Sequence, residues 1–179
     1  MNFIIVDLEA TCLEVKPENY ISEIIEIGAV KVDAKGNILD TFDCFVKPTI
    51  NPVLSDFCKE LTSISQEDVD SGLDRKTALK NFKEFCGNDC MLLSWGAYDK
   101  HQLRKEFAEN DLSTFILNNH HNLKVEFSRV LGREKQYGMA KALRIADIPL
   151  DGTHHRGIDD AKNITKIFQK YIDKWNFIS

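Results

Sequence analysis

The sequence predicts an α/β fold in which a central mixed β-sheet is flanked by α-helices. Three apolar, strand-like stretches occupy the first 48 residues, and turn residues separate the second stretch from the third. Helical patterns then dominate, interrupted by one more apolar stretch at residues 90–95. Strands that come first and then alternate with helices are typical of a mixed sheet covered by helices.

Each early strand is expected for its own reason. Residues 2–8, "NFIIVDL", form a short apolar run with β-branched side chains, which predicts a buried strand. Two further strands are expected over 23–33 and 37–48. The turn-forming "DAKGN" at 33–37 joins these two strands, so we expect a hairpin.

The rest of the chain carries helical periodicity around one strand. "CMLLSW", at 90–95, is expected to be that strand, and a helix follows it directly. The start of 123–132 is also compatible with a strand. The expected helices cover residues 55–61, 65–72, 74–86, 99–110, 123–132, 137–148 and 157–175.

Length and composition fit one domain spanning residues 1–179. The chain is 43% hydrophobic and 28% charged, and no apolar run approaches the roughly 20 residues that span a bilayer. The N-terminus lacks the features of a signal peptide, and the five scattered cysteines show no zinc-site spacing. We therefore expect a soluble, cytoplasmic protein with reduced thiols.

The net charge of −5 argues against a protein that coats nucleic acid with a broad basic surface. It does not exclude a nucleic-acid enzyme whose acidic residues gather in one metal site. Two bound divalent cations would bring the charge from −5 to −1, and the local field would then attract phosphate.

Asp7 and Glu9 lie at the end of the first strand, in "FIIVDLEAT". Strand side chains alternate between faces, so these two carboxylates project to the same side. They repel each other unless a cation joins them, and oxygen ligands of this type suit Mg²⁺ or Mn²⁺. Two solvated acids at a strand end are the simpler interpretation, and this motif alone does not decide between the two.

A phosphatase motif is the second interpretation of the same residues. Haloacid-dehalogenase-type phosphatases also begin with an apolar strand followed by Asp-x-Asp-x-Thr or Val, which would make Asp7 a nucleophile. Here Glu9 stands where the acid/base aspartate belongs. The late pair Asp159 and Asp160 begins a helix after a loop rich in Gly and His, which does not fit that motif.

Asp99, in "SWGAYD", stands where a strand passes into a helix. Aspartate at such a position is a good helix N-cap. It also adds a carboxylate at the carboxyl end of a strand, where open α/β sheets place their ligands. The two roles are compatible.

The stretch "GTHHRGIDDA" offers two adjacent histidines and two adjacent aspartates. At about 100° per residue, the apolar stripe of the last helix runs through Ala161, Ile164 and Phe168. Asp160 falls on the margin of that stripe, where it needs a partner or a metal, whereas Asp159 points to solvent.

His154 and His155 precede that helix in a segment bounded by glycines. Histidine is the natural base for deprotonating a water near neutral pH. Periodicity does not choose between the two, and a pair of exposed loop histidines is the simpler interpretation.

Together these motifs resemble the DEDDh 3′–5′ exonucleases, which have a DnaQ-like, ribonuclease-H-like fold. "DLEATC" is similar to the first motif, "SWGAYD" to the second, and "HRGIDDA" to the third, whose pattern is His, four residues, then Asp. That pattern implies His155 and Asp160. Over residues 2–172 the chain also resembles the Eri-1-like, histone-mRNA-type RNA exonucleases. Animal members carry a SAP domain that is not found here, so their structured target is not expected.

The resemblance implies a single exonuclease domain over residues 1–179. Such an enzyme would hydrolyse single-stranded RNA, and short single-stranded DNA, from a free 3′ end to nucleoside 5′-monophosphates. Two Mg²⁺ or Mn²⁺ ions would be bound, and His155 would be the general base. The implied metal ligands are Asp7, Glu9, Asp99 and Asp160.

The same resemblance implies residues that hold the terminal nucleotide. Phe57 and Tyr98 match positions that sandwich the base, an interaction worth roughly 1–3 kcal/mol. The backbone of Ala10 and Thr11 matches the nucleotide pocket. Phe57 is equally compatible with a helix core. A non-catalytic nucleic-acid-binding module on the same fold is the remaining alternative, although all five motif residues are present.

Overall fold

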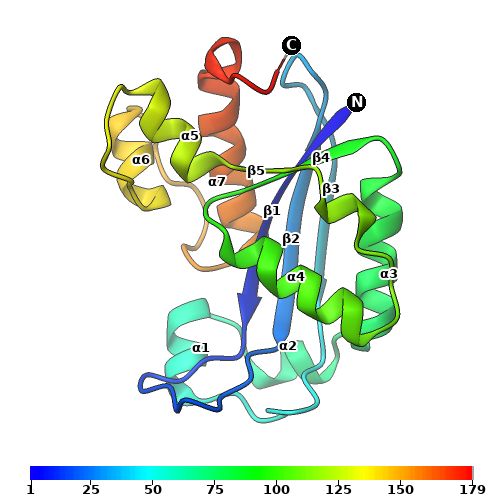
Figure 1. Cartoon of the computed structure of the whole chain (residues 1–179). Coiled ribbons are helices and arrows are strands. Elements are labelled where there is room, and N and C mark those ends of the chain that lie inside the picture. Colours follow the sequence, from blue (N-terminus) through cyan, green and yellow to red (C-terminus); the bar gives the residue numbers. More distant parts are fainter. Residues whose placement is uncertain (179) are drawn as a thin grey trace.

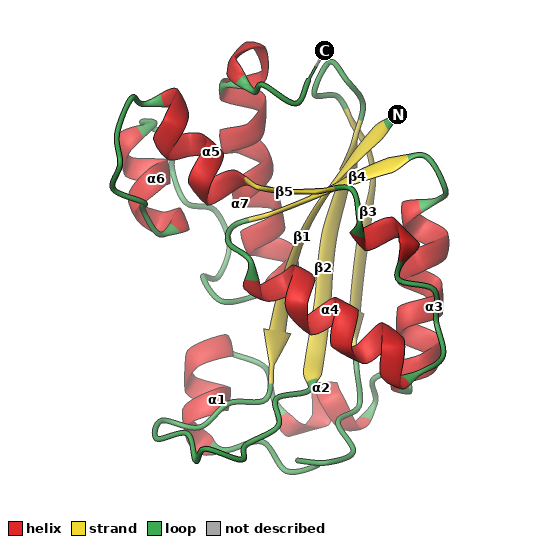
Figure 2. Ribbon diagram, in the orientation of Figure 1, coloured by secondary structure: helices red, strands yellow, loops and turns green. Residues whose placement is uncertain are grey.

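The computed structural model describes residues 1–178, and a five-stranded sheet lies at its centre (Figures 1 and 2). The strand order is β3-β2-β1-β4-β5. β1 pairs antiparallel with β2 and parallel with β4, so the sheet is mixed, as predicted. The strands are β1 (Asn2–Ala10), β2 (Ile24–Val32), β3 (Ile38–Phe45), β4 (Cys90–Ser94) and β5 (His120–Asn122).

Helices cover both faces of this sheet (Figure 2). The helices are α1 (Asp56–Thr62), α2 (Gln66–Asp70), α3 (Arg75–Cys86), α4 (Tyr98–Glu109), α5 (Leu123–Val130), α6 (Met139–Ile145) and α7 (Gly157–Lys170). Short 3₁₀ turns cover Phe115–Leu117 and Ile172–Lys174. Among residues 1–178, no helix has the length and apolar character needed to cross a membrane.

The alternation of β1 explains how two cores form on one strand. Ile4 and Val6 pack into the core shared with α3 and α4, whereas Phe3 and Ile5 pack into the core shared with α5, α6 and α7. A strand that is buried on both faces has a nearly continuous run of apolar residues in its sequence, as "NFIIV" has. This placement leaves the C-terminal end of β1 between the two helical layers.

The predicted hairpin joins β2 and β3, which pair antiparallel. The Asp33 carboxylate accepts hydrogen bonds from the backbone N–H groups of Lys35 and Asn37 at 2.8 and 2.9 Å. Gly36 has a φ of +83°, a conformation that glycine adopts without strain. Local turn chemistry therefore produces this connection.

The largest differences from the expected elements are a missed strand and a shorter last helix. β5 was not predicted, because its residues are polar and carry no apolar pattern. The last helix ends at Lys170 instead of reaching Trp175, and a 3₁₀ turn follows it. Trp175 is nevertheless only 2% exposed, and its indole N–H donates to the Phe168 carbonyl at 2.8 Å. The apolar stripe thus predicted burial correctly beyond the point where the α-helix stops.

Candidate active site

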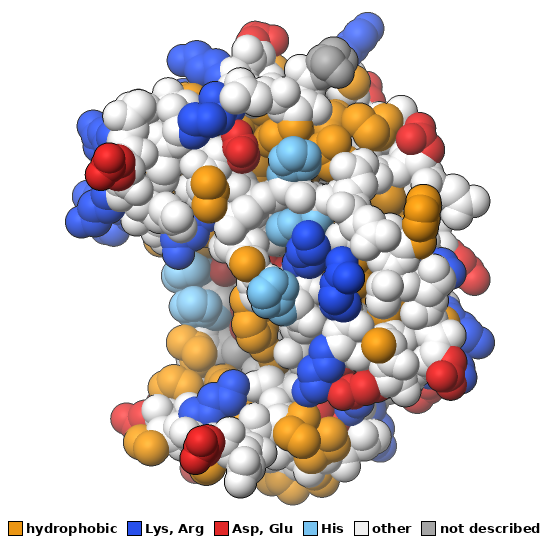
Figure 3. Space-filling model, viewed as in Figure 1, with side chains coloured by type: hydrophobic (Ala, Val, Ile, Leu, Met, Phe, Trp, Pro, Cys, Tyr) orange, Lys and Arg blue, Asp and Glu red, His pale blue; other side chains and the backbone are white. Residues whose placement is uncertain are grey.

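A pocket of about 240 Å³ opens where β1, α4 and α7 meet. In the space-filling view, histidine side chains lie beside a hollow on this side of the molecule (Figure 3). Four separate segments of the sequence contribute to the pocket, and three of them carry at least one acidic residue. Its lining residues are Asp7, Leu8, Glu9, Trp95, Tyr98, Asp99, Met139, His154, His155 and Asp160.

Asp7 and Glu9 reach the pocket from the same face of β1, as strand alternation requires. Asp160 approaches them from the first turn of α7. One carboxylate oxygen from each of these three residues lies within 4.8 Å of the other two. The structure therefore gathers three of the four expected carboxylates into a group of metal-site dimensions.

Asp99 joins the pocket through an unexpected backbone contact. Its Oδ1 accepts a hydrogen bond from the Leu8 N–H at 3.1 Å. β4 pairs with β1 only as far as Ile5, so Asp99 takes the place of a strand partner at Leu8. The N-cap role is wrong, because α4 already begins at Tyr98 and Asp99 lies inside its first turn.

The position of Asp160 depends on how α7 is fixed to the sheet. The carboxylate of Glu26, on β2, accepts hydrogen bonds from the Gly157 and Ile158 N–H groups at 3.0 and 3.3 Å. It also accepts one from the Arg156 Nε at 3.1 Å. A Cβ on Gly28 would lie 2.1 Å from the Gly157 carbonyl carbon, so glycine permits this close approach. A buried carboxylate thus caps and neutralises the helix start.

Both histidines lie against Asp160. The Nδ1 atom of His154 is 2.9 and 3.1 Å from its two carboxylate oxygens, and the His155 backbone N–H donates to one of them at 3.0 Å. The two imidazoles stack with their centroids 4.0 Å apart. His154 is exposed, as the simpler interpretation of the pair expected, but it also contacts a predicted metal ligand.

Asp159 was expected to point to solvent, and this is only partly correct. Its side chain is half-buried and accepts a hydrogen bond from the Thr153 N–H at 2.8 Å. A Cβ on Gly152 would lie 2.4 Å from the Asp159 carboxylate carbon. Asp159 therefore holds the loop that carries the histidines, while Asp160 enters the pocket.

The carboxylates of the pocket are buried close together. Glu9, Asp99 and Asp160 are 9%, 6% and 4% exposed. Burial, reinforced by Glu26 and the other pocket acids, raises the pKa of Glu9 to about 9. Burial also raises the pKa of Asp99 to about 6, and burial with the neighbouring acids raises the pKa of Asp7. Burial together with the charge of neighbouring acids therefore disfavours ionisation of Asp7 and Glu9 in the absence of an ion.

This donor set fits divalent cations. Among residues 1–178, no ion pair with Lys, Arg or His involves Asp7, Glu9 or Asp99, and Asp160 has only His154. Within the described residues, four clustered carboxylates without a Lys or Arg partner supply the oxygen ligands that Mg²⁺ and Mn²⁺ prefer. Bound cations would offset the burial and the repulsion that raise the pKa values of Asp7 and Glu9.

Of the four residues expected to bind the nucleotide, only Tyr98 lines the pocket. Tyr98 lines it and is 49% exposed, so its ring is accessible. Phe57 is half-buried near the start of α1 and belongs neither to the pocket lining nor to the core around Cys58. Ala10 ends β1, and Thr11 is buried, with its hydroxyl accepting the Glu23 N–H at 3.0 Å.

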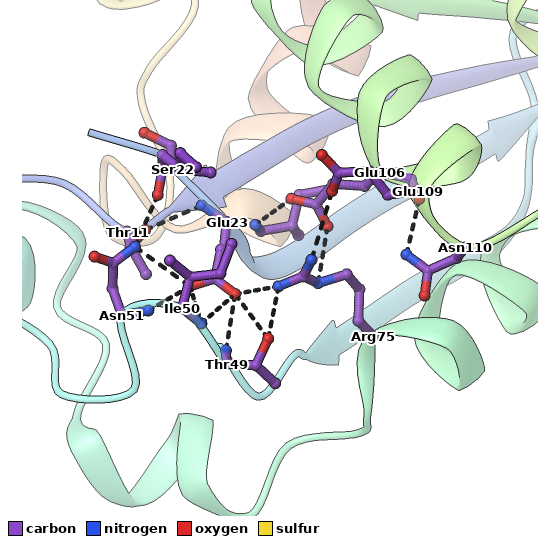
Figure 4. Close-up of polar contacts among 12 residues, drawn as sticks. Thr11, Ser22, Glu23, Thr49, Ile50, Asn51, Arg75, Glu106, Glu109 and Asn110 are labelled. Carbon is purple, nitrogen blue, oxygen red and sulfur yellow. Dashed lines mark hydrogen bonds and ion pairs between the residues drawn. The ribbon is translucent and has the colours of Figure 1, made fainter. Parts of the chain in front are cut away.

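A buried polar network joins the segment after β1 to α4 (Figure 4). The Glu23 carboxylate accepts hydrogen bonds from the backbone N–H groups of residues 49–51, at 2.6 to 2.9 Å, and from Arg75. The same guanidinium lies 3.6 Å from Glu106 of α4. Glu106 in turn accepts the Ile24 N–H at 2.7 Å. This network fixes the helix that carries Tyr98 and Asp99 against the start of β2.

Sequence reasoning missed Trp95 and Met139 as pocket residues. Trp95 belongs to "SWGAYD", so its position near Asp99 was a usable signal. Its indole N–H donates to the Tyr137 carbonyl at 2.9 Å, which ties the pocket wall to the segment before α6. Met139 begins α6, far from every motif in the sequence, and nothing local indicates its role.

Comparison with known proteins agrees with this geometry. Residues 4–168 match the family model described as Exonuclease (RNase T). The chain belongs to this exonuclease family. Exonucleases of the DEDDh type within it depend on divalent metals, and the acidic cluster in the pocket agrees with that dependence.

Relatives of this exonuclease chain occur in animals and bacteria. Mouse "ERI1 exoribonuclease 2" is 29% identical over 94% of this chain but only 28% of its own length. The "Probable 3'-5' exonuclease KapD" of Bacillus subtilis (strain 168) is 28% identical over 94% of this chain and 83% of its own. The chain therefore spans less than a third of the animal relative and most of the bacterial one.

A solved structure supports the same fold. The nuclease domain of 3'hExo, described as a DEDDh family member bound to rAMP, superposes with a TM-score of 0.84 at 28% identity. The match covers 96% of this chain and 92% of that domain. The predicted ribonuclease-H-like, DEDDh-type fold is thereby confirmed.

Proposed function

We propose that this protein is a metal-dependent 3′–5′ exonuclease that acts on single-stranded RNA, and also on short single-stranded DNA. The observation that carries the proposal is the convergence of four carboxylates and two histidines in one pocket. Relatives named as exoribonucleases and a related domain bound to rAMP support RNA as the substrate. In this proposal, residues 1–179 act as one exonuclease domain.

The four carboxylates would hold two Mg²⁺ or Mn²⁺ ions. The bound cations would supply Lewis-acid polarisation of the phosphate and a lower pKa for water. The proposed ligands are Asp7, Glu9, Asp99 and Asp160.

His155 is the proposed general base. Burial and the adjacent His154 lower the pKa of His155, which favours a neutral imidazole that can accept a proton from the attacking water. Water then attacks the terminal phosphodiester, the bond to the 3′ oxygen breaks, and a nucleoside 5′-monophosphate is released. The His155 ring makes no hydrogen bond within residues 1–178, so it is free for this role.

Tyr98 is proposed to stack on the terminal base, since it is exposed at the pocket. Phe57 is proposed as the second stacking residue, and the backbone of Ala10 and Thr11 as part of the pocket wall. Stacking accepts every base because each has a π-face, which suits an enzyme that removes nucleotides in succession.

The test is hydrolysis of a single-stranded RNA of mixed sequence with Mn²⁺, followed by chromatography of the products. The proposal expects nucleoside 5′-monophosphates, no product in EDTA, and no product from Asp7→Asn. Intact RNA after incubation of the folded wild-type protein with Mn²⁺ would contradict it.

The same assay separates the alternatives. A haloacid-dehalogenase-type phosphatase would hydrolyse small phosphomonoesters through a phosphoaspartyl group on Asp7 and leave the RNA intact. A non-catalytic binding module would bind RNA without product.

We also propose a cytoplasmic location. All five cysteines are free thiols in the structure, which fits a reducing compartment.

A further inference from the structure

One face of α4 is basic and open to solvent. Lys100, His101, Arg104 and Lys105 line a surface groove of about 540 Å³, and we call these four residues the α4 basic face. In the space-filling view, Lys, Arg and His side chains gather over this helix (Figure 3). The opposite face of α4 is buried and carries Leu103 and Phe107.

Most of this positive charge is not neutralised by acidic neighbours. Within residues 1–178, neither Lys100 nor Arg104 forms an ion pair, and Arg104 donates only to the Asn118 side-chain oxygen, at 3.3 Å. Lys105 has one acidic neighbour, Glu109, at 4.0 Å. Other arginines are engaged: Arg75 and Arg156, for example, bind buried glutamates. A largely uncompensated basic face is notable in a chain of net charge −5.

The α4 basic face begins beside the pocket. Tyr98 and Asp99 occupy the first turn of α4 and line the pocket, and Lys100 follows directly. At 1.5 Å per residue, the helix rises roughly 9 Å from Asp99 to Lys105. A strand whose 3′ end lies in the pocket can therefore run along this face without leaving the protein.

We propose that the α4 basic face binds the phosphates of the nucleic-acid strand on the 5′ side of the terminal nucleotide. This inference rests on the proposed function and adds the path of the substrate to it. Lysine and arginine bind phosphate independently of sequence, as an exonuclease that shortens varied strands requires. The acidic pocket alone would repel such a strand, and the basic face offsets that repulsion.

A second basic groove on α3 provides a matched control. Lys80 and Lys83 line it together with Glu84, and it shares no lining residue with the pocket. The double variant Lys80→Gln/Lys83→Gln removes the same charge as Lys100→Gln/Arg104→Gln. A general effect of net charge would therefore appear equally in both.

The experiment measures binding of a labelled single-stranded decanucleotide by fluorescence anisotropy in EDTA, across a range of salt concentrations. Lys100→Gln/Arg104→Gln should raise the Kd about tenfold, and the slope of log Kd against log salt should fall by roughly 0.7 for each phosphate that the variant no longer binds. The α3 double variant should leave both unchanged. Equal Kd values for wild type and the α4 double variant, or equal weakening in both double variants, would overturn the proposal.

Turnover with Mn²⁺ separates this proposal from the proposed function. The α4 double variant should raise the KM for the decanucleotide and leave hydrolysis of a dinucleotide unchanged. Equal decreases in activity on the decanucleotide and the dinucleotide would mean that the substitutions disturb Asp99. That result would overturn the proposal that the strand binds along α4. A wild-type protein that binds the decanucleotide but cleaves neither substrate contradicts the proposed function, while the binding comparison still decides the role of α4.

Discussion

Asp160 shows how one side chain can organise its neighbours in a site. Its carboxylate contacts the His154 ring and the His155 backbone, and it lies within reach of Asp7 and Glu9. The helical stripe predicted that Asp160 faces inward, and its 4% exposure agrees. Periodicity did not distinguish the histidines, because neither belongs to a helix or strand; their difference depends on a loop in which His155 has a φ of +64°.

We predict that His155→Ala reduces kcat far more than His154→Ala. Loss of a general base typically costs a factor of about 10² to 10⁴, and the free ring of His155 is the proposed base. His154→Ala removes only an interaction with Asp160, so its kcat should stay within about tenfold of wild type. Steady-state kinetics on single-stranded RNA at saturating Mn²⁺ measure both. The reverse ranking would assign the base to His154.

The start of α7 is the element on which the geometry of the pocket most depends. Glu26 caps it, and Gly28 lets it approach β2 to backbone contact. Neither feature was predicted from the sequence, because each joins residues more than a hundred positions apart. The sequence did predict most of the helices and four of the five strands, since those depend on local apolar periodicity.

Gly28→Ala should destabilise the protein strongly. The new Cβ would lie 2.1 Å from backbone atoms of Gly157 and Ile158. Backbone atoms cannot move aside as the end of a flexible side chain can. We expect a decrease of roughly 3 kcal/mol or more in the free energy of unfolding. Gly138→Ala is the matched control, because no atom lies within 4 Å of its added Cβ. Urea unfolding measures the free energy of unfolding of both variants. Equal decreases would show that the close approach of α7 to β2 does not make Gly28 necessary.

Arg75→Met should also destabilise the protein, through the network in Figure 4. The side chains of Glu23 and Glu106 are each 1% exposed and would be left without their only basic partner in the described part of the chain. Breaking such a buried pair typically costs about 3–5 kcal/mol. Lys76→Met, on the exposed side of the same helix, should change the free energy of unfolding by less than about 0.5 kcal/mol. Similar values for the two variants would show that the network contributes little.

Across the molecule, charge is distributed unevenly. Four carboxylates converge in the pocket, and a largely uncompensated basic face lies beside it on α4. The net charge of −5 alone gave no hint of this separation, since it averages over the whole surface. The motifs predicted which acids would meet, whereas the pocket walls from Trp95 and Met139 required the folded arrangement.

The stability of the metal-free protein should fall as the pH rises. The folded-state pKa values of Glu9, about 9, and Asp99, about 6, exceed their ordinary values of 4.5 and 3.8. The stability these groups contribute is therefore fully present below those ordinary values and is lost as the pH rises through the folded-state pKa values. Mn²⁺ binds the ionised form, so the gain in Tm with Mn²⁺ over EDTA should be larger at pH ~8 than at pH ~5.5. A gain that shrinks with rising pH would contradict this.

The number of Mn²⁺ ions bound per chain, counted by electron paramagnetic resonance titration, addresses the proposed metal centre itself. Wild-type protein with a nucleoside 5′-monophosphate should bind two ions, because four converging carboxylates supply enough oxygen ligands for two. Asp160→Asn should lose at least one of them, because that carboxylate lies with Asp7 and Glu9. Absence of saturable Mn²⁺ binding, or an unchanged count in Asp160→Asn, would contradict the proposed centre.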